Sequence, residues 1–363
     1  MLGQPLERIL TEVETLIIGG GLSGLALAQR LAVARHDYFL IEARDRLGGR
    51  ILSAQHGAGQ FDLGPAWYWP GQPRMAELVR ELDLHHFEQY SKGDLIFEDN
   101  YDRVQRLSGH AMMQGSFRID GTMMQLANGL SRLLRPSRVL TGAQVIALQK
   151  SDSGVGVTLA DQRRFMAKRV VFALPPRLAS GLIFEPDLSE EVRRSLGSVS
   201  TWMAGQSKAV AVYSEPFWRD SGASGDAISR IGPMAEIHDA SPMNGGPYAL
   251  FGFLGIPPSA RQDVSVVREA IVAQLTRIFG PKAQAPLAVK IKDWARDAFT
   301  ATDADQRPLA AHPRYCLPDT LKGVWNGRVL FAGTEVANQF GGYLEGALEA
   351  ADYAAAQILR TEV

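Results

Sequence analysis

The apolar positions near the start of the chain change period, and this change predicts a strand, a helix and a second strand. Residues 13–18 (VETLII) form a short, mostly apolar and β-branched run that is typical of a buried strand. After GGGLSG, apolar residues recur at helical spacing from Leu22 to Leu31. The next apolar run, DYFLIEA, predicts a second strand that ends at Glu42.

A further helix is predicted close to the end of the sequence. Its apolar residues follow one helical face from Leu344 to Leu359, and its alanine, leucine, glutamate and glutamine residues favour helix. Residues 329–332 form a short apolar strand that precedes it. The glycines of residues 341–343 (GGY) form either a simple turn or a place where a ligand approaches the backbone. Strands that alternate with helices predict an α/β fold.

Composition limits the class of protein. The chain has 363 residues, which predicts about two domains, and 46% of them are hydrophobic, enough for a sizeable core. The formal net charge is -1 and the pI is about 6.7, so no basic surface for nucleic acid is expected. Cys316 is the only cysteine, which excludes an internal disulfide and fits a reducing compartment.

The sequence also indicates where the protein works. No apolar run approaches the roughly 18 residues that a membrane helix needs. The N-terminus lacks the pattern of a cleavable signal, and no anchor is expected after the last helix. The adjacent histidines His85 and His86 do not share a helical face, and the other histidines show no metal spacing. We therefore expect a soluble, cytoplasmic protein without a metal site or membrane anchor.

The first turn carries the chemistry of dinucleotide binding. Gly19, Gly21 and Gly24 form G-x-G-x-x-G between a strand and a helix, and Glu42 ends the next strand. Backbone N–H groups and the helix dipole at such a turn hold a pyrophosphate, while the acid accepts from a ribose hydroxyl. The alternative is a purely structural glycine turn.

The next stretch indicates which dinucleotide binds. ARDRLGGR (residues 43–50) and FDLGPAWYWPGQPR (residues 61–74) resemble the second fingerprint of the FAD-containing amine oxidase superfamily. In that reading Arg50 adds a charge-assisted bond to the pyrophosphate. The alternative is that Arg44, Arg46 and Arg50 belong to a solvated basic loop.

The sequence near the end of the chain indicates the family more specifically. RVLFAGTEVANQFGGYLEGALEAA (residues 328–351) closely resembles the closing motif of the flavin monoamine oxidases, and the chain is identified as similar to that family. The resemblance implies that Gly341 and Gly342 let the backbone approach the isoalloxazine. It also implies that N–H groups near Leu344 point at the flavin N1–C2=O locus and that Glu335 binds the ribityl chain.

The middle of the chain extends the resemblance. In LGSVSTWMAGQSKAVAVYSEPFWR (residues 196–219), Lys208 matches the family lysine that reaches flavin N5 through a water. The alternative for a strand lysine is an exposed edge charge. Val145 matches a valine whose backbone meets the adenine, and Trp294 matches a tryptophan under the flavin. RVVFALPP (residues 169–176) matches the strand that returns toward the cofactor.

The resemblance implies a complete set of candidate site residues. Lys208, Tyr343 and Tyr315 are the catalytic candidates, because the family often traps the amine between two aromatic faces. Tyr343 matches one face, whereas Tyr315 and Trp67 are candidates for the other, and a core role is the alternative for each tyrosine. The cofactor-binding candidates are Gly19, Gly21, Ser23, Gly24, Glu42, Arg44, Gly49, Arg50, Gly64, Ala66, Trp67, Val145, Trp294, Gly333, Glu335, Gly342, Tyr343, Leu344 and Ala347.

The chain departs from the family in two places. Residues 73–117 are fewer than in the mitochondrial members, so the entrance loops that control substrate access there are mostly missing. Mitochondrial members attach FAD covalently through a cysteine, and the matching position here is near Asp303. Cys316 does not align with that position. We therefore expect non-covalent FAD and interpret Cys316 as an ordinary, semi-buried thiol.

These observations predict a two-domain α/β protein of the amine-oxidase type, with a Rossmann-like FAD-binding domain and a mixed-sheet substrate domain. The FAD-binding domain is expected at residues 1–72, 118–178 and 298–363, and the substrate domain at residues 73–117 and 179–297. The resemblance implies oxidation of a small-molecule amine to an imine, with O2 as acceptor and H2O2 as product. A dehydrogenase, desaturase or polyamine oxidase on the same fold, or a non-catalytic FAD-binding protein, remains an alternative.

Overall fold

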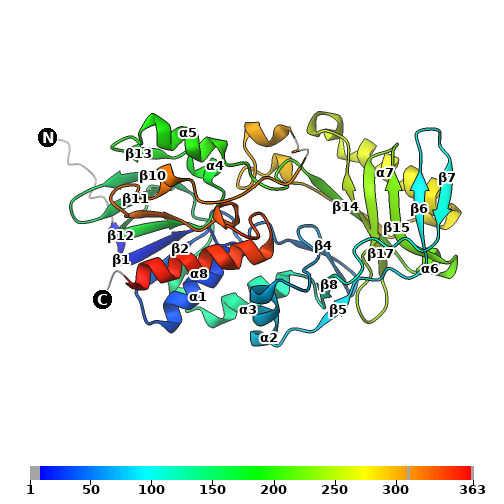
Figure 1. Cartoon of the computed structure of the whole chain (residues 1–363), viewed down its shortest axis with the longest axis horizontal. Coiled ribbons are helices and arrows are strands. Elements are labelled where there is room, and N and C mark those ends of the chain that lie inside the picture. Colours follow the sequence, from blue (N-terminus) through cyan, green and yellow to red (C-terminus); the bar gives the residue numbers. More distant parts are fainter. Residues whose placement is uncertain (1–8, 308, 310, 361–363) are drawn as a thin grey trace. The chain divides into compact units, whose positions relative to one another are not determined.

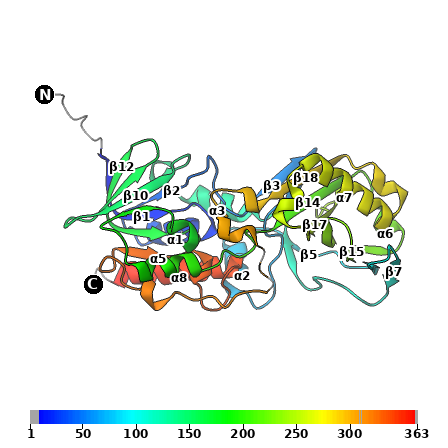
Figure 2. The ribbon, with the colours of Figure 1, turned by 90° about the horizontal axis from the view of Figure 1, so that it is seen from above.

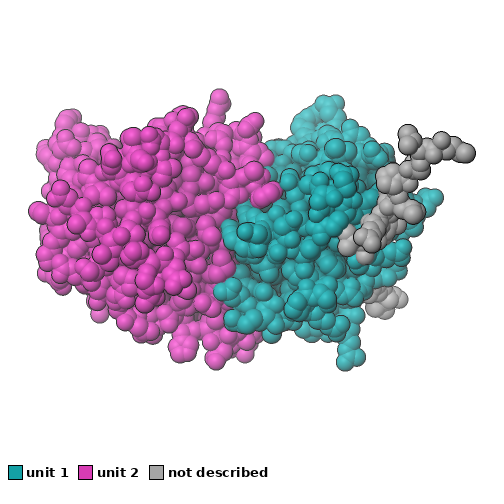
Figure 3. Space-filling model, turned by 180° about the vertical axis from the view of Figure 1, so that it is seen from behind, with its two compact units in different colours: residues 1–49, 126–202, 311–363 teal, residues 50–125, 203–310 magenta. Residues whose placement is uncertain are grey.

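The computed structural model describes residues 9–307, 309 and 311–360, and the chain divides into two compact units (Figures 1 and 3). Unit 1 comprises the chain up to Gly49, residues 126–202 and the chain from Ala311 onward, and unit 2 comprises the remainder. The expectations that the N-terminus carries no cleavable signal and that no anchor follows the last helix concern in part residues 1–8 and 361–363, which lie outside the described residues. The predicted domain boundaries divide the chain by function rather than by packing, so they stay a prediction.

Unit 1 is built on an eight-stranded sheet with the order β13-β10-β11-β12-β1-β2-β9, and β19 pairs with β12. Strands β1, β2, β9, β12 and β19 run parallel, and β11 is antiparallel to both of its neighbours. The strands are β1 (Ile9–Ile18), β2 (Tyr38–Ile41), β9 (Val139–Leu140), β10 (Val145–Lys150), β11 (Val155–Leu159), β12 (Arg164–Phe172), β13 (Ile183–Glu185) and β19 (Val329–Phe331).

The two predicted helices pack against each other in unit 1. Helix α1 (Leu22–Val33) follows β1, and α8 (Leu344–Arg360) lies beside it (Figure 1). The apolar face predicted for the last helix is buried, because Leu348, Ala351 and Ile358 are each at most 1% exposed. The α/β class and the strand–helix–strand start of the chain are therefore confirmed.

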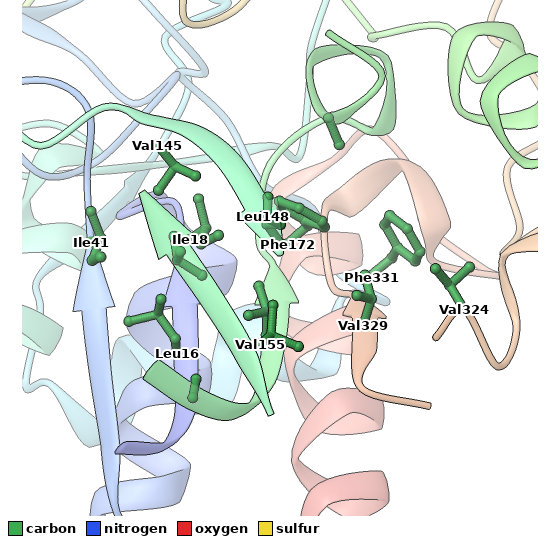
Figure 4. Packing of buried hydrophobic residues seen from close by; sticks show 14 of the residues in the cluster. Leu16, Ile18, Ile41, Val145, Leu148, Val155, Phe172, Val324, Val329 and Phe331 are labelled. Atoms are coloured by element: carbon green, nitrogen blue, oxygen red, sulfur yellow. The ribbon is translucent and has the colours of Figure 1, made fainter. Parts of the chain in front are cut away.

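The core of unit 1 explains why its strands are so apolar. A parallel sheet is covered on both faces, and its strands therefore read as nearly continuous hydrophobic runs. Leu16 and Phe172 are fully buried in the cluster that Figure 4 shows. The side chains labelled there come from β1, β2, β10, β11, β12, β19 and the loop before β19: Leu16, Ile18, Ile41, Val145, Leu148, Val155, Phe172, Val324, Val329 and Phe331.

Unit 2 is built on a seven-stranded sheet with the order β18-β14-β17-β16-β15-β6-β7. Only the β6–β15 pair runs parallel among these neighbours. Helix α7 (Val264–Phe279) packs against this sheet beside β18 (Figure 2). The strands are β6 (Asp94–Glu98), β7 (Val104–Leu107), β14 (Ser207–Tyr213), β15 (Ala223–Ser229), β16 (Met234–Asp239), β17 (Tyr248–Leu254) and β18 (Ala288–Asp293).

Strand β14 is buried along its whole length, and its two faces pack differently. Successive side chains of a strand point to opposite faces. Ala209 and Ala211 join the cluster that contains α7, whereas Val210 and Val212 join the cluster of Trp67. Lys208 has the parity of the second pair, and this alternation places it on the face that carries Trp67.

The remaining elements are short. The further strands of unit 2 are β3 (Ser53–His56), β4 (Gly59–Asp62), β5 (His86–Glu88) and β8 (Phe117–Ile119). The further α-helices are α2 (Pro73–Glu81), α3 (Met124–Leu133), α4 (Pro176–Ala179), α5 (Glu190–Ser198) and α6 (Phe217–Asp220). The 3-10 helices used below are η4 (Trp294–Arg296), η5 (Asp303–Gln306) and η7 (Thr334–Val336). Within residues 9–360 as described, no helix combines the length and hydrophobicity needed to span a bilayer.

Candidate functional site

The turn between β1 and α1 is closed by backbone alone. A Cβ built on Gly24 would lie 1.9 Å from the carbonyl oxygen of Gly19, and one on Gly19 would lie 2.6 Å from that of Ala173. Gly19 also has a φ of +114°, which side chains rarely adopt. Gly21 occupies the N-cap of α1 and has no side chain to bond the first N–H groups. Those N–H groups are suited to an anionic ligand.

A second glycine pair crosses this turn within unit 1. The N–H of Gly48 donates to the carbonyl oxygen of Gly20 at 2.8 Å. A Cβ on Gly49 would lie 3.1 Å from the Cα of Gly21. Arg46 donates to the carbonyl of Gly49 at 2.9 Å, so this arginine braces the loop rather than being solvated alone. The two glycine segments therefore form a cradle that side chains would fill.

Glu42 lies beside the cradle and is 4% exposed. Its carboxylate accepts from the N–H of Gly20 at 2.7 Å and from the N–H of Arg44 at 2.9 Å. The Arg44 guanidinium lies 3.5 Å from the same carboxylate. Arg44 therefore pairs with an acid, in contrast to the alternative of a solvated basic loop. A glycine cradle, an uncapped helix N-terminus and an acid at the end of β2 fit the diphosphate and ribose of FAD.

The other unit 1 candidates surround the same strand ends. The Ser23 hydroxyl donates to the carbonyl of Ala332, which ties α1 to the end of β19. A Cβ on Gly333 would lie 2.5 Å from the carbonyl oxygen of Leu174. Glu335 in η7 is fully buried, and Val145, which begins β10, is 6% exposed. Their cofactor contacts stay predictions.

The glycines before α8 have packing partners of their own. A Cβ on Gly341 would lie 2.2 Å from the Cβ of Tyr315. Gly342 has a φ of +85°, and a Cβ there would lie 3.0 Å from Trp202. The family resemblance implies that these glycines leave room for the isoalloxazine. In the structure each of them packs against an aromatic side chain. A contact of Gly342 with the cofactor stays a prediction.

The two tyrosine candidates differ in their surroundings. Tyr343 is 37% exposed, and its carbonyl accepts from the Thr334 hydroxyl at 2.7 Å just before α8 begins at Leu344. Tyr315 is 8% exposed, and its hydroxyl donates to the carbonyl of Ser200 at 2.9 Å. Tyr315 therefore packs as a core aromatic would, while the ring stacked on Tyr343 is that of His312. No motif in the sequence indicated His312.

Lys208 in unit 2 is 2% exposed, so the alternative of an exposed edge charge is wrong. Strand β14 lies between β18 and β17, which leaves it no free edge. The ammonium donates to the carbonyl of Gly64 at 3.0 Å and lies 3.9 Å from the ring centroid of Phe251. Burial lowers the pKa of Lys208 to about 7; the charge of Asp62 raises this pKa and that of Arg118 lowers it.

Asp62 and Arg118 are buried charges that the sequence did not single out. Asp62 accepts from the N–H of Met123 at 3.0 Å through one carboxylate oxygen, and the other has no partner among the described residues. Arg118 donates to the carbonyls of Ser241 and Ala240, while its Nε is unpaired among those residues. Burial raises the pKa of Asp62 to about 6, against the lowering effect of Lys208 and Arg118. Asp62 lies in FDLGPAWYWPGQPR, a stretch that resembles the family, yet that stretch does not indicate the electrostatic role of Asp62.

The tryptophan candidates of unit 2 are held by their indole N–H groups. Trp67 donates to Gln89 at 2.8 Å, and Trp294 in η4 donates to the carbonyl of Leu63 at 3.0 Å. A Cβ on Gly64 would lie 2.1 Å from the carbonyl oxygen of Arg50, which explains this glycine by close packing. These bonds fix both rings, and their contacts with a cofactor stay predictions.

The remaining candidates add one correction. Ala66 is 3% exposed, and Ala347 in α8 is 7% exposed. Cys316 is exposed, so the expectation of a semi-buried thiol is wrong. Its neighbour Tyr315 packs beneath Gly341, whereas Cys316 itself lies exposed in an irregular segment. In the part of the chain that the structure describes, no cluster of three or more metal-ligating side chains occurs.

Two family models match this chain. The model of the NAD(P)-binding Rossmann-like domain matches residues 17–82, and that of the flavin containing amine oxidoreductases matches residues 95–359, well over half of the sequence. The chain belongs to the flavin-containing amine oxidoreductase family. As a member of this family it is an oxidoreductase that acts on amines, with FAD as its cofactor.

Relatives of this amine oxidoreductase match over nearly its whole length. AofH of Mycobacterium tuberculosis, assigned as a flavin-containing monoamine oxidase, is 26% identical over 95% of this chain and 96% of the relative. Flavin-containing amine oxidase B of Homo sapiens is 23% identical over 95% of this chain and 86% of the relative.

Solved structures show the same fold. A putrescine oxidase with bound putrescine superposes with a TM-score of 0.81 at 20% identity, over 96% of this chain and 99% of that one. Cyclohexylamine oxidase from Brevibacterium oxydans superposes with a TM-score of 0.80 at 21% identity, over 97% and 100% of the two chains. The predicted amine-oxidase fold is therefore confirmed.

Proposed function

We propose that this amine oxidoreductase is an oxidase that takes a hydride equivalent from the α-carbon of an amine and uses O2 as its electron acceptor. Bound FAD would supply the acceptor of that hydride and the centre from which O2 receives the electrons and leaves as H2O2. The imine would then hydrolyse to an aldehyde or ketone. The observation that supports this proposal is the burial of Lys208, the residue that the sequence resemblance matches to the family's flavin-directed lysine.

Unit 1 would hold the nucleotide part of the cofactor. The crossing of the two glycine segments leaves only backbone at the cradle, and the first turn of α1 offers N–H groups to a diphosphate. Glu42 would accept from the ribose hydroxyls, because its carboxylate lies against the same turn. The Arg44 guanidinium helps to hold that carboxylate in place.

Unit 2 would supply the charge for the oxygen step. Lys208 lies among Phe251, Phe253 and Trp67, and such aromatic surroundings exclude water from the ammonium. An ammonium in a dry site stabilises negative charge more strongly than one in water. Asp62 favours the protonated form of Lys208, because the Asp62 charge raises the pKa of the lysine. Lys208 would therefore assist the transfer of electrons to O2.

Tyr343 would contact the amine. It is the catalytic candidate of unit 1 whose ring remains partly exposed, whereas Tyr315 is packed and bonded through its hydroxyl. An aromatic face orients an alkyl or aryl chain and tolerates a nearby cation. Tyr343 would thereby position the α-carbon without taking part in proton transfer.

The experiment that tests this function separates the two half-reactions. FAD-loaded protein is mixed anaerobically with a panel of primary amines, secondary amines and polyamines, and flavin absorbance is followed. O2 is then admitted, and H2O2 is measured. Bleaching by an amine followed by recovery with stoichiometric H2O2 supports the oxidase. Bleaching that persists in O2 favours a dehydrogenase, a carbon–carbon double bond in the product favours a desaturase, and no bleaching by any amine contradicts the proposal.

We also propose that FAD is bound without a covalent bond. The family's attachment position corresponds to residues near Asp303 in η5, where no cysteine stands, and Cys316 is exposed and free. Acid precipitation of the yellow protein should release all of the flavin into the supernatant. Flavin that stays with the denatured pellet would contradict this.

We further propose a cytoplasmic location, which the single free cysteine supports, since secreted proteins commonly carry disulfides. Fractionation of the native host's cells, with the protein followed by antibody, tests the location. Recovery with the soluble cytoplasmic fraction is expected, and recovery with membranes or the culture medium would contradict it.

A further inference from the structure

The ring stacked on Tyr343 belongs to a histidine that no motif indicates. The rings of His312 and Tyr343 have centroids 5.0 Å apart and an interplanar angle of 24°, which is a stacked arrangement. Both residues belong to unit 1, and the His312 side chain is exposed. An exposed histidine has no burial to hold it, so its position must come from specific contacts.

Three further contacts fix this imidazole. Trp202 meets the ring edge-on at a centroid distance of 4.6 Å, and Tyr315 does so at 5.4 Å. Nε2 lies 2.9 Å from the carbonyl oxygen of Gly341. A carbonyl only accepts hydrogen bonds, so Nε2 must carry a proton there. The carbonyl belongs to the residue two before Tyr343, and the same short turn therefore holds both rings.

The glycines of this turn make the arrangement possible. Any side chain at residue 341 would collide with Tyr315, and one at residue 342 would press on Trp202, the two rings that flank His312. The turn, the two flanking rings and the stacked pair therefore form one packed group.

The ring separation limits what Tyr343 can do. A planar group held between two parallel rings needs about 7 Å between them, twice the roughly 3.5 Å contact distance of carbon atoms. The observed 5.0 Å leaves no room for a substrate between His312 and Tyr343. His312 therefore covers one face of Tyr343, and an amine has only the opposite face available.

We propose that His312 is a positioning residue, which backs one face of Tyr343 so that the amine meets only the opposite, fixed face of that ring. This inference rests on the proposed function of Tyr343 as the amine-contacting ring. Stacking accounts for the effect, and the bond to Gly341 only orients the imidazole.

The first measurement tests the stack without turnover. In protein labelled at its seven histidines, the His312 C–H resonance should lie upfield because of the Tyr343 ring current, and His312→Phe identifies this signal by removing it. Tyr343→Leu should move the signal downfield, toward that of His110, an exposed histidine of unit 2. A His312 signal that stays in place in Tyr343→Leu overturns the stack and the inference with it.

The second measurement tests the effect on chemistry by anaerobic flavin reduction with a good amine substrate. His312→Ala should lower the limiting rate of flavin reduction about two- to tenfold, which corresponds to the interaction free energy of one aromatic pair. The rate of reoxidation by O2 should not change. His312→Phe, which keeps a ring, should restore most of the rate, whereas His312→Gln, which keeps only a donor, should not. His110→Ala is the matched control and should have no effect.

The outcomes distinguish the inference from the function beneath it. A reduction rate unchanged in His312→Ala, or fully restored in His312→Gln, overturns the positioning role while amine oxidation stands. Parent protein that no amine reduces overturns the proposed function, and His312 then has no substrate to position, although the resonance test still reports on the stack.

Discussion

The two units of this amine oxidoreductase surround their buried charged side chains with different groups. In unit 1 the buried carboxylate of Glu42 meets the backbone N–H groups of Gly20 and Arg44 and the Arg44 guanidinium, beside a turn in which glycines leave no room for side chains. In unit 2 the surroundings of Lys208 consist of aromatic rings and two further buried charges, Asp62 and Arg118. In unit 1 backbone N–H groups and one arginine hold a single buried acid, whereas in unit 2 three buried charged side chains act on one another.

The difference between these two surroundings indicates how substitutions in each should act. Backbone dipoles persist as long as the turn folds, so unit 1 depends on the absence of side chains. A buried charge depends on each of its partners, because losing one partner leaves the others unpaired at a cost of about 3–5 kcal/mol. We therefore expect substitutions around Lys208 to act mainly on reaction rates, and those around Glu42 mainly on cofactor affinity.

The sharpest test of unit 2 is Lys208→Met, which removes the charge and keeps the stem. Reoxidation of reduced flavin by O2 should slow about a hundredfold or more, because losing one preorganised group typically costs about 2.7–4 kcal/mol. Amine-driven reduction should change little. Stopped-flow absorbance of each half-reaction measures both. Lys282→Met, an exposed lysine paired with Glu215 in the same unit, is the control. Reoxidation as fast as in the parent would move the dehydrogenase alternative ahead.

The matching test of unit 1 is Glu42→Ala. FAD should bind about ten- to a hundredfold more weakly, since a hydrogen bond to a charged group contributes about 1.5–3 kcal/mol. Titration of apoprotein with FAD, followed by flavin fluorescence, measures the affinity. Glu14→Ala, which removes a carboxylate of β1 paired with Lys168, should leave affinity unchanged. Equal affinities for Glu42→Ala and the parent would show that the glycine turn is only structural.

The two units should also differ in how pH affects them: the reoxidation rate should depend on pH, whereas FAD affinity should not follow the same profile. Burial lowers the pKa of Lys208 to about 7, so its ammonium is present below that pH and is lost above it. Reoxidation should therefore fall as pH rises through about 7, approaching about tenfold per pH unit. In Asp62→Asn the fall should begin at lower pH, because the Asp62 charge raises the pKa of Lys208. FAD affinity should not follow this profile. A flat reoxidation rate between pH 6 and pH 9 would contradict the role of the ammonium.

The smallest expected effect concerns Tyr343. Tyr343→Ala should keep the FAD spectrum and slow anaerobic reduction about two- to tenfold, because one aromatic contact contributes about 0.5–1.5 kcal/mol. Tyr353→Ala, which removes an exposed tyrosine of the helix that follows Tyr343, provides the control. An unaltered rate of reduction would return Tyr343 to a structural role.

The local pattern of apolar residues was sufficient to predict several strands and helices of unit 1. The run at residues 13–18, the helical spacing after Leu22 and the helix from Leu344 all lie within the elements found. Their signals are short in sequence, since a strand, a tight turn and a helix each depend on neighbouring residues. The family resemblance at both ends of the chain likewise rested on contiguous motifs.

Other features needed contacts between distant parts of the chain. Asp62 and Arg118 lie far from Lys208 in sequence, and only the folded unit makes them part of one electrostatic group. The division of the chain by packing also differs from the functional boundaries expected from the sequence. The expected burial of Cys316 is wrong because the exposure of a residue in an irregular segment depends on what packs beside it.

The sequence by itself determined the family, the glycine turn after the first strand and the acid beside it, because each is written in consecutive residues whose geometry is local. The tertiary structure alone decided the burial of Lys208, the packing of Tyr315 beneath Gly341 and the stacking of His312 on Tyr343. Burial and ring contact arise between segments that are remote in sequence, and no spacing rule links such residues before the chain has folded.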